Sequence, residues 1–352
     1  MKSTLGHGCI AEDARVRIGR TDPYDRRIAP EVLAARRAVM AVFFANGALF
    51  ANWVTRVPAI KDAIGTGTGP LGVALLGIGA GSLVSMPFSG RLCRRFGSAA
   101  VVTASGLALS VVLLGPAVVG DVVALGLLLL FYGAGFGLLD VAMNVQAVIV
   151  VKLVDRPIMP AFHAAFSFGG LVGAGTGGLA AAAGLHPLPH FALVGAAMAG
   201  TALWARRHLL PDEEDDGVAA DDGVDDAADV GAEIGAPVPD GVAAVEAGPG
   251  RRFDPFVVGV GALAACAALG EGAMADWTAL FLRDVRDVSP GPAAAGFAAF
   301  SVAMTAGRLG GERAIETLGS VRVLQLGGAV SALGVLLAVA VPSPVAGVAG
   351  FL

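Results

Sequence analysis

Two carboxylates, Glu271 and Asp276, stand inside a long run of apolar residues that covers about 256–282. An ionised side chain is costly to bury in apolar surroundings, so such a residue usually faces an interior cavity, a partner charge or water. A carboxylate held at that depth can take up and release a proton, which is the chemistry of proton-coupled processes. Because Glu271 lies deeper in the run than Asp276, we take Glu271 as the stronger candidate.

Polar residues also interrupt other apolar runs. Asp140 and Asn144 are four residues apart, so a helix would place them on one face. His163 belongs to the residue type that most readily changes charge near neutral pH. For these three residues two interpretations stay open. They contact a solute or a proton, or they make ordinary hydrogen bonds between helices or at an apolar–aqueous boundary.

The composition argues against a soluble enzyme. Hydrophobic residues make up 55% of the 352 residues, charged residues 15%, and the mean hydropathy is +0.74, which indicates a membrane protein. Cys9, Cys93 and Cys266 lie far from each other and form no CxxC pair or other metal-site pattern, and the chain has no phosphate-binding loop or metalloprotease motif. We therefore expect no enzymatic activity, no cofactor, no metal ion and no nucleic-acid partner.

The elements that position these residues are apolar runs of about 20 residues, the length that a helix needs to cross a bilayer. Short segments rich in Gly and Pro separate the runs, and a further run begins after Pro344 and stops at Leu352. The runs cover 38–57, 71–90, 98–118, 122–150, 161–184, 188–205, 256–282, 292–310 and 323–341. We therefore predict an all-α membrane protein that crosses the bilayer several times.

Charged residues are distributed unevenly between the runs. Of the 29 acidic residues, 13 fall between Asp212 and Glu246, where there is no Lys or Arg, so we predict a solvated, disordered linker at 209–253. With a disordered N-terminal tail, 1–35, in the cytoplasm, most Lys and Arg residues outside the apolar runs lie on the cytoplasmic side of a plasma (inner) membrane. The linker then separates an N-terminal six-helix bundle, 36–208, from a partial C-terminal bundle, 254–352.

An internal repeat relates the two bundles. NGALFANW, residues 46–53, echoes EGAMADW, residues 271–277, and FGSAAV at 96–101 echoes LGSVRV at 318–323. The similar offsets indicate a duplicated unit of about six helices, of which the second copy is incomplete, with about nine to ten of twelve helices present. Asn46 is then the counterpart of Glu271. We expect Trp53 and Trp277 in the aromatic belt of the membrane, with Asn52 and Asp276 beside them at the interface.

One loop resembles a known family motif. GRLCRRFGSAAVV, residues 90–102, is similar to the cytoplasmic loop signature of the major facilitator superfamily and matches it at Gly90, Arg95 and Gly97. It departs from the signature at Arg94, where the family has an acidic residue. The segments around the first, fourth and fifth runs resemble a bacterial branch of that superfamily that is grouped with fucose-permease-like transporters.

The resemblance implies a secondary active transporter with two six-helix repeats, which moves a small organic solute such as a sugar or a related metabolite by alternating access. Proton coupling is expected from Glu271, Asp140 and His163. Two alternatives are export of amphipathic compounds and a membrane sensor or scaffold that does not transport. We expect a monomer whose partners are the solute, protons and the lipid bilayer.

Two groups of residues form the predicted sites. The solute and proton pathway comprises Asn46, Asp140, Asn144, His163 and Glu271. A predicted inner gate, in which the loops after the second and eighth runs pair on the cytoplasmic side, comprises Arg91, Arg94, Arg95, Arg308 and Glu312.

Overall fold

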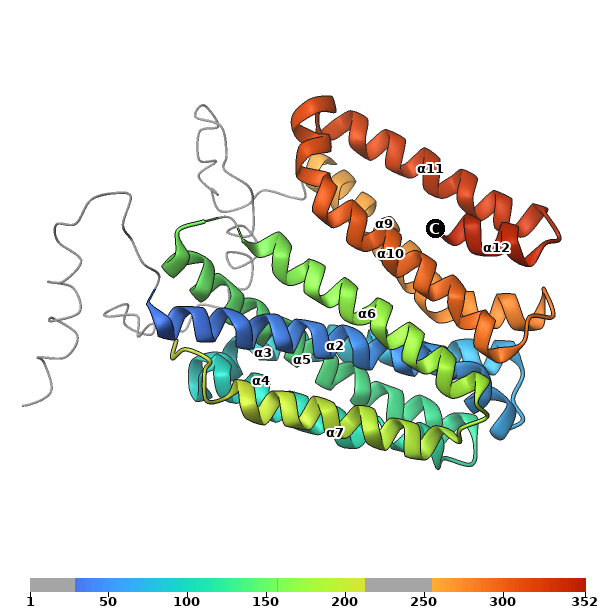
Figure 1. Ribbon diagram of the computed structural model, residues 1–352, viewed down its shortest axis with the longest axis horizontal. Coiled ribbons are helices and arrows are strands. Elements are labelled where there is room, and N and C mark those ends of the chain that lie inside the picture. The colour runs from blue at the N-terminus through green and yellow to red at the C-terminus, as the bar shows by residue number, and fades with distance from the viewer. Residues whose placement is uncertain (1–28, 157, 213–254) are drawn as a thin grey trace, which may run out of the picture.

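The computed structural model describes residues 29–156, 158–212 and 255–352 (Figure 1). Nearly all of the predicted tail and linker therefore lies outside the described residues. Within them the chain is helical, and the helices are α2 (Pro30–Ala63), α3 (Thr68–Phe96), α4 (Ser98–Val112), the short η1 (Gly115–Ala117), α5 (Val122–Val154), α6 (Met159–Ala182), α7 (Pro187–Ala205), α9 (Pro255–Asp284), α10 (Pro290–Leu318), α11 (Ser320–Ala340) and α12 (Pro344–Phe351).

The predicted runs coincide with these helices. Eight of the described helices are long and apolar enough to cross a membrane, which fits the prediction of a multi-pass membrane protein. The predicted run 292–310 forms α10, which is not among the eight. Helix α2 differs most from its prediction, because it begins at Pro30 and continues to Ala63, beyond both ends of the run 38–57.

Local sequence signals explain where several helices begin and end. Asp121 caps α5, since its side chain accepts hydrogen bonds of 2.9 Å from the backbone N–H groups of Val123 and Ala124. Gly97 joins α3 to α4 with φ 83° and ψ 142°, and Gly319 joins α10 to α11 with φ 79° and ψ 150°. Both need a positive φ that favours glycine. These two glycines are the repeat-related positions predicted from FGSAAV and LGSVRV, so the local backbone agrees with the duplication.

Helices α2 and α6 approach each other closely because small residues face each other along the contact. A Cβ atom added to Gly47 would lie 2.0 Å from the carbonyl oxygen of Phe166, and one added to Gly169 would lie 2.0 Å from the carbonyl oxygen of Phe44. Side chains larger than hydrogen would therefore push the helices apart. This small-residue packing is typical of helices in membranes, where close backbone contact replaces the hydrophobic effect between helices.

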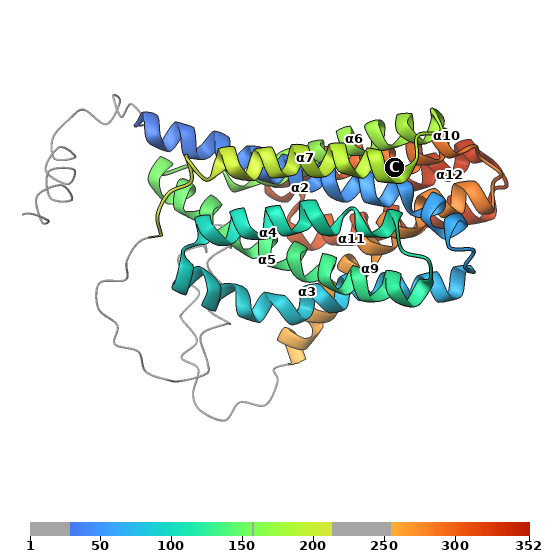
Figure 2. The same cartoon turned by 90° about the horizontal axis from the view of Figure 1, so that it is seen from below.

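The core of the first six helices, α2 to α7, contains large side chains that are fully buried. They include Trp53, Tyr132, Phe43, Phe162 and Phe191. Trp53 is 0% exposed, so the prediction that it belongs to the aromatic belt is wrong. Figure 2 shows α3, α4 and α5 side by side in this group.

Helices α9 to α12 form a second group that contacts the first along α6 and α10 (Figure 1). Gly178 of α6 faces Ala294 of α10, and farther along the same pair Gly170 faces Ser301. Figure 1 shows the two groups converging toward the end that carries the α2–α3 and α9–α10 connections, and separating toward the other end. A pocket lies along this contact between the groups.

Candidate functional site

A pocket lies where α2 and α6 of the first group meet α9 and α10 of the second. It encloses about 370 Å³ of empty space, some of it open to solvent. Its lining combines aromatic rings, small residues and one pair of opposite charges: Gly47, Phe50, Phe166, Ser167, Gly170, Glu271, Ala275, Phe297, Phe300, Ser301, Met304 and Arg308.

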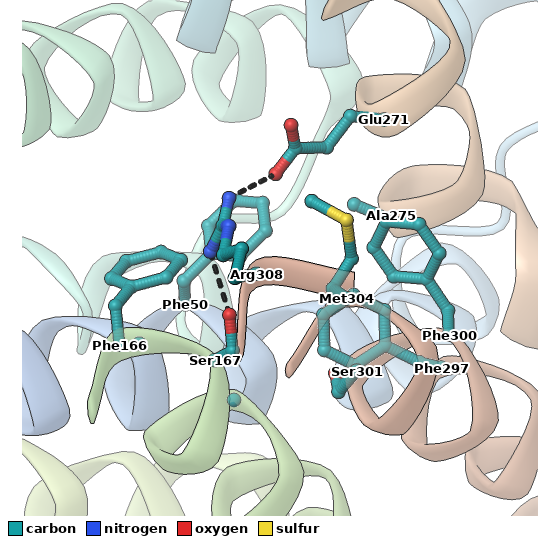
Figure 3. A pocket seen from close by; sticks show the side chains of 12 residues that line it. Phe50, Phe166, Ser167, Glu271, Ala275, Phe297, Phe300, Ser301, Met304 and Arg308 are labelled. Atoms are coloured by element: carbon teal, nitrogen blue, oxygen red, sulfur yellow. Dashed lines mark hydrogen bonds and ion pairs between the residues drawn. The ribbon is translucent and has the colours of Figure 1, made fainter. Parts of the chain in front are cut away.

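Arg308 is the centre of the polar part of this pocket (Figure 3). Its Nη1 donates to the Ser167 hydroxyl at 2.6 Å and lies 3.5 Å from the carbonyl oxygen of His163. Its Nη2 lies 3.4 Å from Glu271 Oε1, which is long for an ion pair. The side chains of Arg308 and Glu271 are 27% and 48% exposed, respectively. The guanidinium is therefore held firmly by α6 and only loosely by Glu271.

Aromatic rings form the apolar part. The Phe50 and Phe297 rings have centroids 6.4 Å apart with an edge-to-face arrangement, and Phe297 and Phe300 are 5.9 Å apart. In Figure 3, Phe50 and Phe166 lie on one side of Arg308, and Phe297, Phe300 and Met304 lie on the other. These side chains offer flat apolar surfaces to a ligand, next to the charges of Arg308 and Glu271.

The structure separates the predicted pathway residues. Glu271 lines the pocket, and His163 contributes its carbonyl oxygen to Arg308 while its ring packs edge-on against Phe43 at 5.5 Å. Asn46 precedes Gly47 of the lining, but its side chain is buried against Met143 of α5, with Nδ2 3.8 Å from the sulfur. Asp140 and Asn144 share one turn of α5, where Asn144 Nδ2 donates to the Asp140 carbonyl oxygen at 2.8 Å, and neither lines the pocket.

The predicted gate residues also fall in different places. Arg91, Arg94 and Arg95 are exposed at the end of α3, where Arg91 and Arg95 lie over the rings of neighbouring phenylalanines on the same segment. Arg308 lies inside α10 and not in a loop after it, since the helix continues to Leu318. In the described structure Arg308 contacts Ser167 and Glu271 and does not contact the three arginines of α3. The side chain of Glu312 lies outside the described residues.

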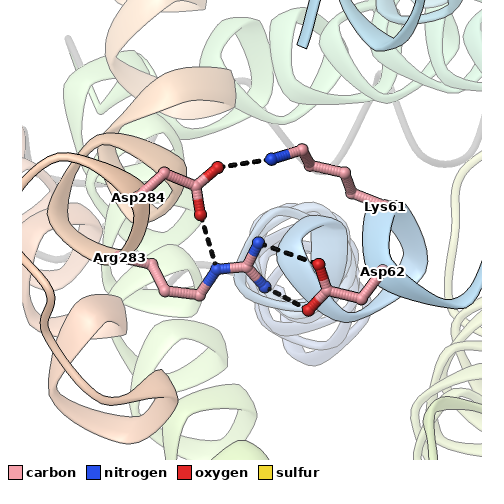
Figure 4. A network of polar contacts seen from close by, with 4 residues as sticks. All are labelled: Lys61, Asp62, Arg283 and Asp284. Atoms are coloured by element: carbon pink, nitrogen blue, oxygen red, sulfur yellow. Dashed lines mark hydrogen bonds and ion pairs between the residues drawn. The ribbon is translucent and has the colours of Figure 1, made fainter. Parts of the chain in front are cut away.

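Sequence reasoning missed a cluster of four charges that joins the two groups (Figure 4). Lys61 Nζ lies 2.5 Å from Asp284 Oδ2, and Arg283 donates to both carboxylate oxygens of Asp62 at 2.7 and 3.1 Å. Arg283 also donates to Asp284 at 2.8 Å. Lys61 and Arg283 are 222 positions apart, as are Asp62 and Asp284, the same offset as FGSAAV and LGSVRV. Each half thus offers a cation and an acid, and each cation pairs with the acid of the other half.

A second missed cluster lies inside the first group. Asn52 is 3% exposed, and its Oδ1 lies 2.8 Å from His190 Nε2 and accepts from the Thr176 hydroxyl at 3.2 Å. Asn52 is therefore a buried hydrogen-bonding residue and not an interfacial one, which corrects the prediction. Arg56, one turn farther along α2, donates to the carbonyl oxygen of Leu185. In the sequence, Asn52, Arg56 and His190 lie near the ends of apolar runs. Residues at the membrane–water boundary are also common there, so position alone did not distinguish a buried hydrogen-bonding residue from a boundary residue.

Comparisons with known proteins give relatives of one kind. No protein-family model matches the chain. The chain is 35% identical over 311 residues to an uncharacterised MFS-type transporter of Yersinia pestis, where MFS denotes the major facilitator superfamily. That alignment covers 88% of this chain and 73% of the relative. The chain is also 32% identical over 308 residues to the uncharacterised transporter y4wD of Sinorhizobium fredii, covering 88% of this chain and 75% of that relative.

A third relative and a solved structure agree with these matches. The membrane protein MosC of Rhizobium meliloti is 27% identical over 314 residues, covering 89% of this chain and 70% of MosC. The crystal structure of the nucleoside transporter NupG superposes with a TM-score of 0.60 over 90% of this chain and 76% of NupG, at 13% sequence identity. At that identity the likeness to NupG concerns the fold.

Proposed function

The chain belongs to the major facilitator superfamily, and from this premise we propose that it moves a small organic solute across the cytoplasmic membrane by alternating access. The observation that carries the proposal is the pocket shared by α2, α6, α9 and α10. It combines the Arg308–Glu271 pair with four phenylalanine rings at the contact between the two groups of helices. A polar site between two repeat-related halves suits a transporter in which the halves rock about a central solute.

In this proposal the protein lies in the inner membrane with its N-terminus in the cytoplasm. In that orientation, most of the Lys and Arg residues that lie outside the apolar runs are on the cytoplasmic side. The α2–α3 and α9–α10 connections then face outward. The Lys61, Asp62, Arg283 and Asp284 cluster holds the halves together at this outer end. Opening toward the outside requires these cross-half pairs to separate, while the solute site opens alternately to each side.

Proton coupling through Glu271 is the second part of the proposal. Glu271 is a half-exposed carboxylate beside Arg308, so it can exchange protons with water and can be released from the guanidinium when it is protonated. Among the other pathway residues, His163 is nearest to this pair through its carbonyl oxygen, whereas the Asp140 side chain does not line the pocket. We therefore place the coupling at Glu271.

Reconstitution tests the proposal. Purified protein in liposomes is assayed for uptake of a labelled panel of sugars, nucleosides and small carboxylates, with and without a pH gradient. We expect one class of solute to enter faster than into protein-free liposomes, and the gradient to accelerate its entry. Glu271→Gln should keep downhill transport and lose the acceleration. An unchanged proton dependence in that variant would remove Glu271 from the mechanism.

The aromatic lining favours a second candidate, export of amphipathic compounds. Phe50, Phe166, Phe297 and Phe300 give the pocket an apolar wall that a hydroxyl-rich sugar does not require. The same liposomes discriminate the two candidates when they are loaded with an amphipathic dye. Faster dye efflux together with absent uptake of the labelled panel would favour export.

A further inference from the structure

The Arg308–Glu271 pair is the least satisfied ion pair between described side chains, and its geometry indicates what the pocket binds. Arg283 holds Asp62 with two hydrogen bonds of 2.7 and 3.1 Å, the fork arrangement that a guanidinium prefers with a carboxylate. Arg308 instead has a single contact of 3.4 Å with Glu271. The Arg308 guanidinium is nevertheless held in place, because Nη1 is bonded to Ser167 of α6. A fixed guanidinium with a loosely bound carboxylate is suited to exchange that carboxylate for another.

The remainder of the pocket indicates the body of the ligand. The Phe50, Phe297 and Phe300 rings follow one another in the pocket lining, with neighbouring centroids 6.4 and 5.9 Å apart. Aromatic side chains arranged in this way bind a flat or cyclic apolar body, with about 0.5–1.5 kcal/mol for each favourable ring pair.

The charges of the pocket set a condition on binding. The charged side chains that line the pocket are Glu271 on α9 and Arg308 on α10. His163 on α6 contacts Arg308 through its carbonyl oxygen, Asp276 follows Glu271 five residues later on α9, and α2 contributes Gly47 and Phe50, which carry no charge. Arg308 and Glu271 together are neutral. A ligand carboxylate that binds Arg308 displaces Glu271 and leaves one negative charge in excess, close to an apolar wall. A proton taken from water by Glu271 restores neutrality.

On the basis of the proposed function, we propose that the transported solutes are small ring-bearing monocarboxylates whose carboxylate replaces Glu271 on Arg308 while Glu271 takes up one proton. No covalent bond forms or breaks other than the O–H bond of the Glu271 carboxyl group. The solute and the proton thus enter the pocket together, which gives the coupling a physical cause.

Binding to the purified full chain tests this without transport. The probes are 3-phenylpropionate, 3-phenylpropanol and 3-phenylpropylamine, which share one ring and one chain and differ in the end group. Calorimetric titrations near neutral pH in two buffers of different ionisation enthalpy give the affinity and the number of protons taken up. We expect the carboxylate to bind at least about tenfold more tightly than the alcohol or the amine, with about one proton taken up for each ligand.

Three variants locate the effect. Arg308→Gln should weaken carboxylate binding at least about tenfold, and Arg313→Gln, an exposed arginine on the same helix, should leave it unchanged. Glu271→Gln should keep the affinity and abolish the proton uptake. Equal binding of the alcohol, tighter binding of the amine, no binding of any probe, or proton uptake that persists in Glu271→Gln would each overturn the inference.

Failure of this inference and failure of the proposed function give different results. If the carboxylate binds with the expected pattern but liposomes show no uptake of any solute, the function is wrong and the binding site remains. If liposomes take up an uncharged solute through the pocket and the carboxylate does not bind, the function remains and the solute class is wrong.

Discussion

The four-charge cluster at the outer end allows a quantitative prediction about conformational equilibrium. Among the described residues, the ion pairs Lys61–Asp284 and Arg283–Asp62 cross between the two halves, and both link α2 to α9. The Lys61, Asp284 and Arg283 side chains are 15%, 26% and 16% exposed, whereas Asp62 is 65% exposed. Partly exposed pairs of this kind contribute roughly 0.5–1 kcal/mol each after screening by solvent.

Removing both acids therefore takes about 1–2 kcal/mol from the state in which the outer end is closed. Because 1.4 kcal/mol corresponds to a factor of about 10, the population that is open to the outside should rise roughly 5- to 30-fold in an Asp62→Ala, Asp284→Ala double variant. High salt should reduce the difference between this variant and the wild type, since it screens partly exposed charges.

Cysteine labelling measures the shift. Ser301 lines the pocket and is 4% exposed, so Ser301→Cys in a background without Cys9, Cys93 and Cys266 reports access to the site. A membrane-impermeant thiol reagent is applied from the side of the α2–α3 connection. The labelling rate should rise by the same 5- to 30-fold as the open population, roughly, if opening is fast compared with labelling.

The control is Asp287→Asn, which removes an exposed acid near the same end and keeps a residue type that tolerates the positive φ of 53° at this position. It should leave the labelling rate unchanged. The reasoning is refuted if the double variant labels at the wild-type rate. It is also refuted if a double-mutant cycle of Lys61→Ala and Asp284→Ala gives no coupling between the two residues.

Two further predictions concern packing and buried hydrogen bonds. Gly47→Val places a side chain against a backbone carbonyl of α6 and should destabilise the protein by about 3 kcal/mol or more. Its control is Gly200→Ala, whose added methyl group meets open space. Thermal unfolding in detergent should show a lower unfolding temperature for Gly47→Val and little change for Gly200→Ala. Asn52→Ala leaves His190 without its partner at 2.8 Å and should cost about 1–3 kcal/mol, well above the cost of Thr201→Ala at a partly exposed position. Equal unfolding temperatures for these two variants would contradict the role given to Asn52.

The sequence predicts the helices well because the bilayer imposes a length of about 20 apolar residues, a signal that does not depend on tertiary contacts. Gly97 and Gly319 support the predicted duplication, since both have a positive φ at repeat-related positions between two helices. The family also follows from local motifs, and the match to the Yersinia pestis relative confirms it.

Positions near the ends of apolar runs were harder to predict. The predicted first run ends at residue 57, one residue after Arg56, yet α2 continues to Ala63. Asn52 and Trp53 therefore lie inside the helix and face α5, α6 and α7, where their polar atoms and rings are buried. A hydropathy pattern cannot distinguish a boundary residue from a buried one when a charged residue lies one turn away.

The candidate site was predicted in part. Glu271 was singled out for its depth in an apolar run, and the structure places it in the pocket. Arg308 was assigned to an inner gate because it was placed in the loop after the eighth run, whereas its partner Ser167 lies 141 residues away on another helix. The pairing of charges between α2 and α9 was missed for the same reason, although the common offset of 222 residues contained the signal.

Uptake into liposomes by wild type, Arg308→Gln and Arg313→Gln tests most directly whether solutes cross through the pocket. The solute is whichever member of the labelled panel the wild type transports. The account predicts that Arg308→Gln lowers uptake at least about tenfold, while Arg313→Gln stays within about twofold of the wild type. Wild-type uptake no faster than that of protein-free liposomes, or uptake by Arg308→Gln equal to that by Arg313→Gln, would contradict it.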